Sequence, residues 1–235
     1  MHIHVNVAIN TKKMFGFKKK YTLSDLENAT LDVELNRNDY RIAVIEDKIF
    51  PHLEALQRHE FNITLFKDIE RLSMLNDFQI IVSDIRGVGK FLQSKLEGAH
   101  LIQEINKKFP NVYLIAYSSS RFDPTFNKYL ELCDHCEKKS IDITEWTESL
   151  DYAIKMVNSP LFQWEKTRKR LLQKKVPLER ISKIQNDYIK SIIKKKPELL
   201  KKTINKQRNI NTEGLKSIFD SITKFTATFV AELLK

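Results

Sequence analysis

The sequence predicts an α/β protein with a doubly wound, five-stranded parallel sheet, followed by an all-α region. Two observations support this. Between residues 39 and 159, short apolar runs alternate with stretches of helical periodicity, a pattern typical of a parallel sheet covered by helices. From residue 160 onward, apolar residues recur at helical spacing only. We therefore divide the chain into an N-terminal extension (1–38), an α/β domain (39–159) and a helical region (160–235).

The balance of basic and acidic residues also changes near residue 160. The 235 residues carry a formal net charge of +10, and 42% of them are hydrophobic. This composition argues against a disordered, collagen-like or membrane-spanning protein. Residues 1–159 hold 21 basic and 23 acidic side chains, whereas residues 160–235 hold 19 and 7. The basic excess therefore lies in the helical region, which suggests two units with different partners.

Cysteine content and apolar patterning indicate a cytoplasmic protein. Cys133 and Cys136 are too close together to staple a fold, and their motif lacks the second pair of ligands expected of structural zinc. We find no signal peptide and no apolar run long enough for a membrane span.

The α/β domain contains five predicted strands with helices between them. The strands are expected at 42–45, 63–66, 78–83, 112–117 and, more weakly, 136–139. Helices are expected at 50–59, around 69–75, from 101 to about 110, around 126–132 and at 143–157. In the extension, 2–7 and 31–35 alternate like short strands, and Ser24 begins a brief helix.

The helical region is predicted to form four helices. They cover 162–175, a segment after Pro177, 198–207 and a segment from about 211 to 233. Apolar residues in the last helix repeat nearly every 3.5 positions, which favours a coiled coil or a bundle.

Polar side chains follow the predicted strands, at positions where a buried core would have apolar residues. Glu46 and Asp47 follow the first strand, Asp84 ends the third, Ser118 follows the fourth and Lys139 ends the fifth. If the third strand lies beside the first, the three carboxylates converge and repel one another. A hard divalent cation, most simply Mg²⁺, resolves that conflict. Simple helix capping by these acids is the alternative, but it does not explain their convergence.

At these residues the chain resembles the receiver domain of two-component response regulators. The matching segments occur in order at the strand ends: Ile45-Glu46-Asp47, Val82-Ser83-Asp84, Glu97-Gly98, Tyr117-Ser118-Ser119 and Lys139-Ser140-Ile141. The resemblance covers residues 39–159, about half of the chain, and implies the flavodoxin-like receiver fold.

The resemblance also implies a role for each residue. Asp84 resembles the phosphoacceptor, which receives a phosphoryl group from a sensor histidine kinase or a phosphotransfer protein. Glu46, Asp47 and Asp84 resemble the Mg²⁺ ligands, with the backbone carbonyl of Arg86 as a further ligand. Ser118 and Lys139 resemble the hydroxyl and the ammonium that contact the phosphoryl group. No activity is expected beyond the protein's own Mg²⁺-dependent phosphoryl transfer and dephosphorylation.

The sequence departs from the receiver pattern in three places. The segment between Asp84 and Gly98 is longer by about six residues and forms an enlarged loop. Ser140 follows Lys139 where the family has proline. Cys136 stands where most receivers carry a switching aromatic residue.

The sequence of the basic helices is compatible with more than one way of passing on a signal. The cations considered for nucleic-acid or partner contacts are Lys166, Arg168, Lys169, Arg170, Lys194, Lys195, Lys196, Lys201 and Lys202. We find no helix-turn-helix, because the second helix is apolar where a reading helix needs polar residues. The leading hypothesis is a response regulator that signals through these helices by protein interaction or homodimerisation. The alternatives are a DNA-binding transcriptional regulator and a receiver-like scaffold that is never phosphorylated.

Overall fold

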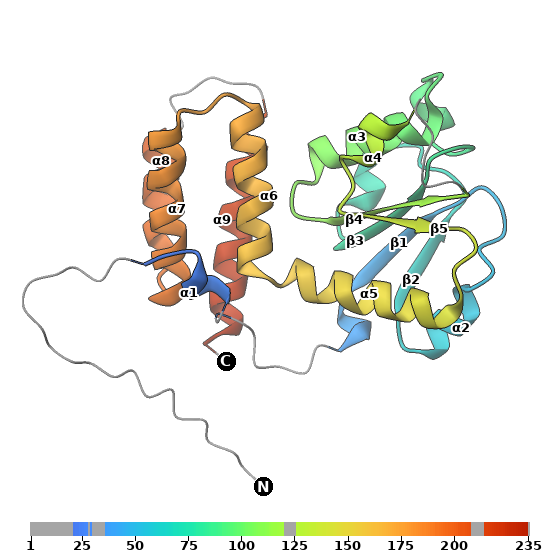
Figure 1. Ribbon diagram of the computed structural model, residues 1–235, viewed down its shortest axis with the longest axis horizontal. Helices are drawn as coiled ribbons and strands as arrows, with labels where there is room; N and C mark the ends of the chain where they lie inside the picture. Colours follow the sequence, from blue (N-terminus) through green and yellow to red (C-terminus); the bar gives the residue numbers. More distant parts are fainter. Residues whose placement is uncertain (1–20, 28, 30–35, 120–125, 208–213, 235) are drawn as a thin grey trace, which may run out of the picture.

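A computed structural model describes residues 21–27, 29, 36–119, 126–207 and 214–234. The strands expected at 2–7 and 31–35 lie outside these residues. An α/β domain and a helical bundle lie side by side and are joined through α5 (Ile143–Val157), as Figure 1 shows. No helix in the described ranges is both long and apolar enough to cross a membrane.

The α/β domain is built on one five-stranded parallel sheet, as the sequence predicts. The strands are β1 (Arg41–Ile45), β2 (Asn62–Phe66), β3 (Ile80–Asp84), β4 (Tyr113–Ser118) and β5 (His135–Lys138). Their order is β2-β1-β3-β4-β5, which is the flavodoxin-like arrangement. Ile45 pairs with Ser83, so the residues that follow β1 and those that end β3 lie at the same edge.

Two apolar cores, one on each face, explain why the central strands are continuously hydrophobic. One core lies beneath α2 (Leu53–Arg58) and α5, where Trp146 is fully buried. The other lies beneath α3 (Glu97–Lys108). Asp142 begins α5 with a capping box that it shares with Glu145.

Two predicted helices are much shorter than expected. The segment around 69–75 forms only the 3-10 turn η2 (Leu72–Leu75), and the segment around 126–132 forms the single turn α4 (Asn127–Leu130). The apolar side chains of Ile69 and Leu75 still reach the core beneath α3. Asp68, just before η2, accepts hydrogen bonds from a distant loop, which fixes this segment without a full helix.

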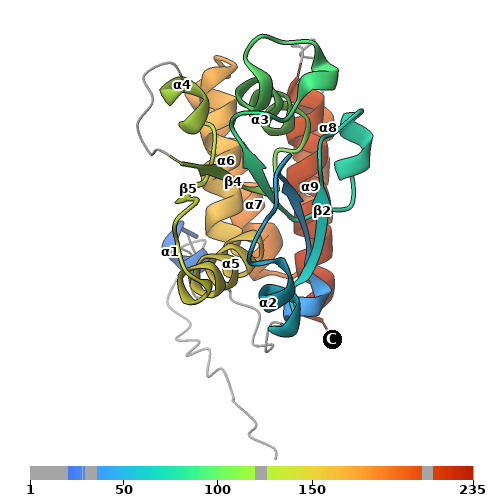
Figure 2. The same ribbon diagram turned by 90° about the vertical axis from the view of Figure 1, so that its right-hand side faces the viewer.

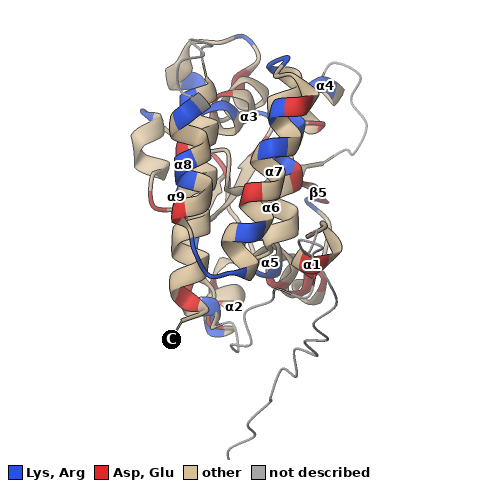
Figure 3. Cartoon of the chain, turned by 90° about the vertical axis from the view of Figure 1, so that its left-hand side faces the viewer, with Lys and Arg blue, Asp and Glu red and all other residues tan. Residues whose placement is uncertain are grey.

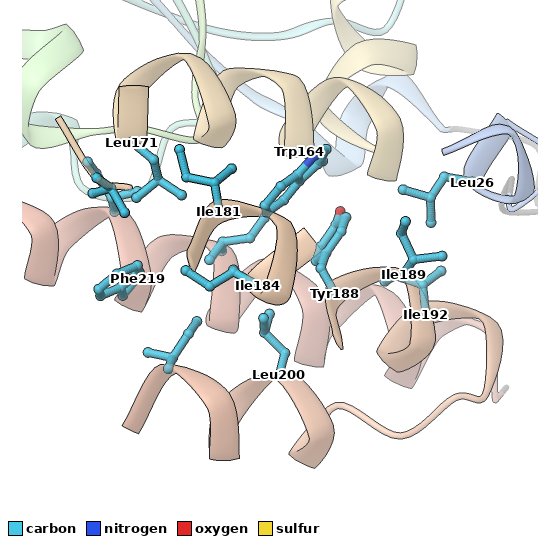
Figure 4. Packing of buried hydrophobic residues seen from close by; sticks show 14 of the residues in the cluster. Leu26, Trp164, Leu171, Ile181, Ile184, Tyr188, Ile189, Ile192, Leu200 and Phe219 are labelled. Carbon is cyan, nitrogen blue, oxygen red and sulfur yellow. The ribbon is translucent and has the colours of Figure 1, made fainter. Parts of the chain in front are cut away.

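The helical region forms a bundle of four long helices. They are α6 (Pro160–Gln173), α7 (Leu178–Ile193), α8 (Glu198–Gln207) and α9 (Leu215–Glu232). Figure 4 shows Trp164 beside Tyr188 in the bundle core, where their stacked rings have centroids 5.4 Å apart. The buried hydroxyl of Tyr188 donates a hydrogen bond to the Pro160 carbonyl at 2.7 Å. Its polar group is therefore satisfied inside the core.

Part of the N-terminal extension joins this bundle. The short helix α1 (Ser24–Glu27) forms where the sequence predicts a helix start. Its Leu26 is 1% exposed and packs in the same cluster as Trp164 and Tyr188. Two segments far apart in the sequence therefore share one core (Figure 1).

We predict that Leu26→Ala lowers the free energy of unfolding of the bundle by about 2–4 kcal/mol, because it removes a buried side chain and leaves a cavity. The measurement is urea unfolding followed by the fluorescence of Trp164, in a Trp146→Phe background that removes the reporter of the other domain. Leu178→Ala, at a leucine that is 67% exposed, is the matched control and changes stability by less than about 0.5 kcal/mol. Equal effects of the two substitutions contradict the placement of Leu26.

Candidate functional site

Three carboxylates converge at the carboxyl ends of β1 and β3. One oxygen from each of Glu46, Asp47 and Asp84 lies within 4.8 Å of the others. The exposed fraction is only 1% for Glu46 and 5% for Asp84, whereas Asp47 is partly exposed. Burial of several like charges is unfavourable unless cations or hydrogen bonds compensate it. The site is therefore a place where positive charge is required.

Backbone donors hold two of these carboxylates in place. One oxygen of Asp84, Oδ1, accepts from the backbone N–H of Ile85 at 2.7 Å and from that of Arg86 at 3.2 Å. Oε1 of Glu46 accepts from the N–H of Lys48 at 3.1 Å. The second oxygen of each carboxylate remains available for a cation.

Lys139 supplies that cation in the structure. Its Nζ donates to Asp84 Oδ2 at 2.6 Å and also to Glu46 Oε2. Burial disfavours its charge, but the hydrogen bonds to Asp84 and Glu46 outweigh burial and raise the pKa of Lys139. The ammonium also lies 4.9 Å from the ring centroid of Tyr117. The neighbouring Lys138 is exposed, so the lysine expected from the sequence is the one that reaches the site.

Ser118 and Cys136 lie on the strands that flank this centre. Tyr117 pairs with Asp84, so Ser118 comes one residue beyond that pair at the same edge, where it is buried. Its carbonyl accepts from the N–H of Lys139 at 2.9 Å. Cys136, on β5, is partly buried against the core beneath α3.

The enlarged loop after β3 packs against the acidic group. Gly87 adopts a φ of +76°, and a Cβ there would lie 2.5 Å from Asp47 Oδ2. Glycine is therefore required both for the left-handed backbone and for the close approach. The N–H of Gly87 donates to Glu97 Oε2 at 2.6 Å. The loop is thus anchored directly beside Asp47.

Asp68 and Lys90 add contacts that sequence reasoning missed. Asp68 accepts from the N–H of Gly89 at 2.5 Å and from that of Lys90 at 3.0 Å. The Lys90 ammonium lies 3.6 Å from Asp47 Oδ2. The length of the segment between Asp84 and Gly98 indicated an enlarged loop, but nothing in the sequence indicated that Asp68 anchors it.

The donor set fits Mg²⁺. Mg²⁺ prefers oxygen ligands and is commonly held by one or two carboxylates together with water and phosphate oxygens. Three carboxylates offer such oxygens within 4.8 Å of one another. Gly87, without a Cβ, leaves room for the carboxylate of Asp47.

Two of the nine candidate cations in the tail are partly buried between the domains. Lys166 Nζ donates to Asp134 Oδ2 at 2.5 Å and to the Val112 carbonyl at 2.6 Å. Arg170 donates to the Asn106 carbonyl at 2.7 Å. Burial lowers the pKa of Lys166, although Asp134 opposes the shift, and it lowers the pKa of Arg170 to about 10. Their charged groups thus bind the α/β domain, which lies in front of the bundle in Figure 2.

The other seven candidate cations are exposed: Arg168, Lys169, Lys194, Lys195, Lys196, Lys201 and Lys202. Lys195 reaches the carboxyl end of α9 and donates to the Leu233 carbonyl at 2.8 Å. Figure 3 shows Lys and Arg spread along several helices of the bundle rather than gathered in one patch.

Several solved receiver domains match about half of this chain. The receiver domain of NtrX from Brucella abortus is 20% identical, with a TM-score of 0.40 over 48% of this chain and 97% of that one. The response regulator TrrA from Thermotoga maritima, solved with Mg²⁺ and BeF, is 18% identical, with a TM-score of 0.39 over 48% of this chain and 98% of that one. A longer NtrX from Brucella abortus, solved with ATP, is 17% identical with a TM-score of 0.42.

The match to the longer NtrX covers 56% of this chain and 34% of that one. This chain therefore spans about a third of the length of that protein. No protein-family model and no curated protein matches the chain. The fold itself follows from the strand order of the sheet, which is that of receiver domains.

We predict that Lys139→Met lowers the free energy of unfolding by about 1–3 kcal/mol at neutral pH without divalent cations, because Glu46 and Asp84 lose their shared counter-charge. Adding Asp84→Asn recovers part of the loss, since it removes one of the two negative charges. The measurement is urea unfolding followed by the fluorescence of Trp146 in a Trp164→Phe background. Lys138→Met, at the exposed neighbour, is the control; an equal loss there contradicts the role of Lys139.

Proposed function

We propose that the chain is a two-component response regulator whose Asp84 accepts a phosphoryl group from a histidine kinase or a phosphotransfer protein. The observation that carries this proposal is the convergence of Glu46, Asp47, Asp84 and Lys139 at the strand ends of a receiver-type sheet. Phosphoryl transfer is catalysed mainly by positioning the reactants and neutralising charge. The proposal is supported by groups that are already held in place and carry the charges that both requirements call for.

In the proposed reaction, a carboxylate oxygen of Asp84 attacks the phosphorus of the donor. A P–O bond to Asp84 forms as the donor's P–N bond breaks, and the departing imidazole nitrogen keeps the bonding electron pair. Glu46, Asp47, Asp84 and the backbone carbonyl of Arg86 would hold Mg²⁺, which would supply positive charge to the phosphoryl oxygens. Lys139 exchanges its bond to Asp84 for an ion pair with the new phosphoryl group, and the Ser118 hydroxyl donates a hydrogen bond to it.

We further propose that the output runs through the bundle, by protein interaction or homodimerisation. Leu178, at the start of α7, is 67% exposed, and Leu172 on α6 is 39% exposed. Such apolar side chains suit a protein contact. Of the nine candidate cations, seven remain exposed for a DNA-binding output, since Lys166 and Arg170 are engaged between the domains.

We predict that incubation with Mg²⁺ and acetyl phosphate adds the mass of one phosphoryl group to the wild-type protein and none to Asp84→Asn. Asp77→Asn, at an exposed aspartate next to Arg41, is the control and is modified like the wild type. Intact-protein mass spectrometry measures the product, and beryllofluoride binding provides a second readout. A wild-type protein that neither gains this mass nor binds beryllofluoride refutes the proposal and favours the scaffold.

Lys90 is expected to compete with Mg²⁺ for Asp47. Its ammonium lies 3.6 Å from Asp47 Oδ2, and its side chain is 59% exposed. We therefore predict that Lys90→Ala tightens Mg²⁺ binding by roughly twofold to fivefold, the range expected for an exposed ion pair. Isothermal titration calorimetry gives the affinity. Lys95→Ala, at an exposed lysine of the same loop, leaves it unchanged; weaker binding in Lys90→Ala contradicts the competition.

A further inference from the structure

A cleft of about 590 Å³ lies between the two domains. Its walls come from residues at the amino ends of β1, β3 and β4 and from α6 and α9. This places it at the end of the sheet opposite to Asp84. Small-molecule sites commonly occupy clefts of several hundred Å³ between domains, so both its size and its position suit a ligand.

Gln163, on α6, joins the bundle to the α/β domain in the wall of the cleft. This glutamine is 1% exposed, and its amide nitrogen donates to the carbonyls of Asn111 at 3.1 Å and Val157 at 3.2 Å. Its Oε1 has no hydrogen-bond partner among the residues that the structure describes. All three residues line the cleft. Because this oxygen is itself buried, Gln163 contributes to the cleft by joining the bundle to the α/β domain rather than by offering an open acceptor.

Aromatic rings and cations also line the cleft. Phe109 and Phe225 contribute apolar wall. Lys108 and Lys224 are exposed, and neither forms an ion pair with any described residue, although Lys108 lies 5.4 Å from the ring centroid of Phe109.

The charge balance of the walls favours an anion. They hold three cations, counting Arg41, against two acids, Asp77 and Glu232. Asp77 already pairs with Arg41 at 3.5 Å. Two lysines and Glu232 then remain, so the walls keep an excess of one positive charge that can bind an anionic group near an apolar wall.

We propose that this cleft binds a small aromatic anion. The ring packs against Phe109 and Phe225, and the carboxylate, sulfonate or phosphate contacts Lys108 and Lys224. The ligand contacts both domains and therefore favours the arrangement in which they are docked together. This input is separate from phosphoryl transfer, because the cleft and Asp84 lie at opposite ends of the sheet.

The probe for this proposal is anilinonaphthalene sulfonate, an aromatic anion with one N–H, whose fluorescence rises in apolar surroundings. We expect saturable binding with one site per chain. Lys108→Glu combined with Lys224→Glu weakens this binding by roughly tenfold. The matched control combines Lys107→Glu with Lys216→Glu, at exposed lysines on the same two helices that do not line the cleft; it leaves the affinity within about twofold.

Competition then identifies the chemistry of the ligand. Phenyl phosphate and benzoate should displace the dye, whereas inorganic phosphate alone should not, because it lacks the ring. Displacement of the dye by inorganic phosphate alone overturns the aromatic part of the proposal. Binding that does not saturate, or that both double variants weaken equally, overturns the site itself. The Asp84→Asn protein should bind the dye like the wild type, so this test is independent of whether Asp84 is phosphorylated.

Discussion

The α/β domain depends on the burial of Glu46 and Asp84 at neighbouring strand ends. Two carboxylates in that position repel each other unless a cation lies between them. Lys139 meets this requirement by contacting both, and it can do so only because β5 ends at the same edge as β1 and β3. Strand order, strand register and the position of Lys139 therefore together determine how the charges of the two buried carboxylates are compensated. A phosphoryl group or Mg²⁺ arriving at these oxygens has to change the contacts of Lys139.

The short strand β5 connects this centre to the bundle. Lys139 follows its last residue, and Asp134, which pairs with the buried Lys166 of α6, comes immediately before its first. Charged groups paired away from water interact more strongly than exposed ones, and removing one partner leaves the other uncompensated. A change in the hydrogen bonding of Lys139 therefore acts on a strand whose other end holds the domain interface. In the proposed output, β5 therefore connects Lys139 with the ion pair between Asp134 and Lys166.

Much of this organisation could be predicted from the sequence. Continuous apolar runs indicate strands buried on both faces, and the polar residues that end them indicate the acidic group around Asp84. The turn η2 was not predictable, because apolar spacing around Ile69 does not reveal that Asp68 binds a loop about twenty residues away. Nor could composition separate Lys166 and Arg170 from their exposed neighbours, since burial is decided by the docking of two domains. The burial of Leu26 in the bundle core was not predictable either, because it depends on how segments far apart in the sequence pack together.

The candidate cations of the helical region therefore fall into two groups, one in the interface with the α/β domain and one on the surface. Lys166 and Arg170 neutralise carboxylate and carbonyl oxygens in a buried interface, where burial lowers the pKa of both. The other candidate cations are exposed and are distributed over several helices, so salt screens their attraction to any polyanion strongly. A dispersed surface charge of this kind supports solubility and weak, salt-sensitive association. A specific partner must be recognised by shape and apolar contact, and for this the exposed leucines and the interdomain cleft provide more definite features than the net charge.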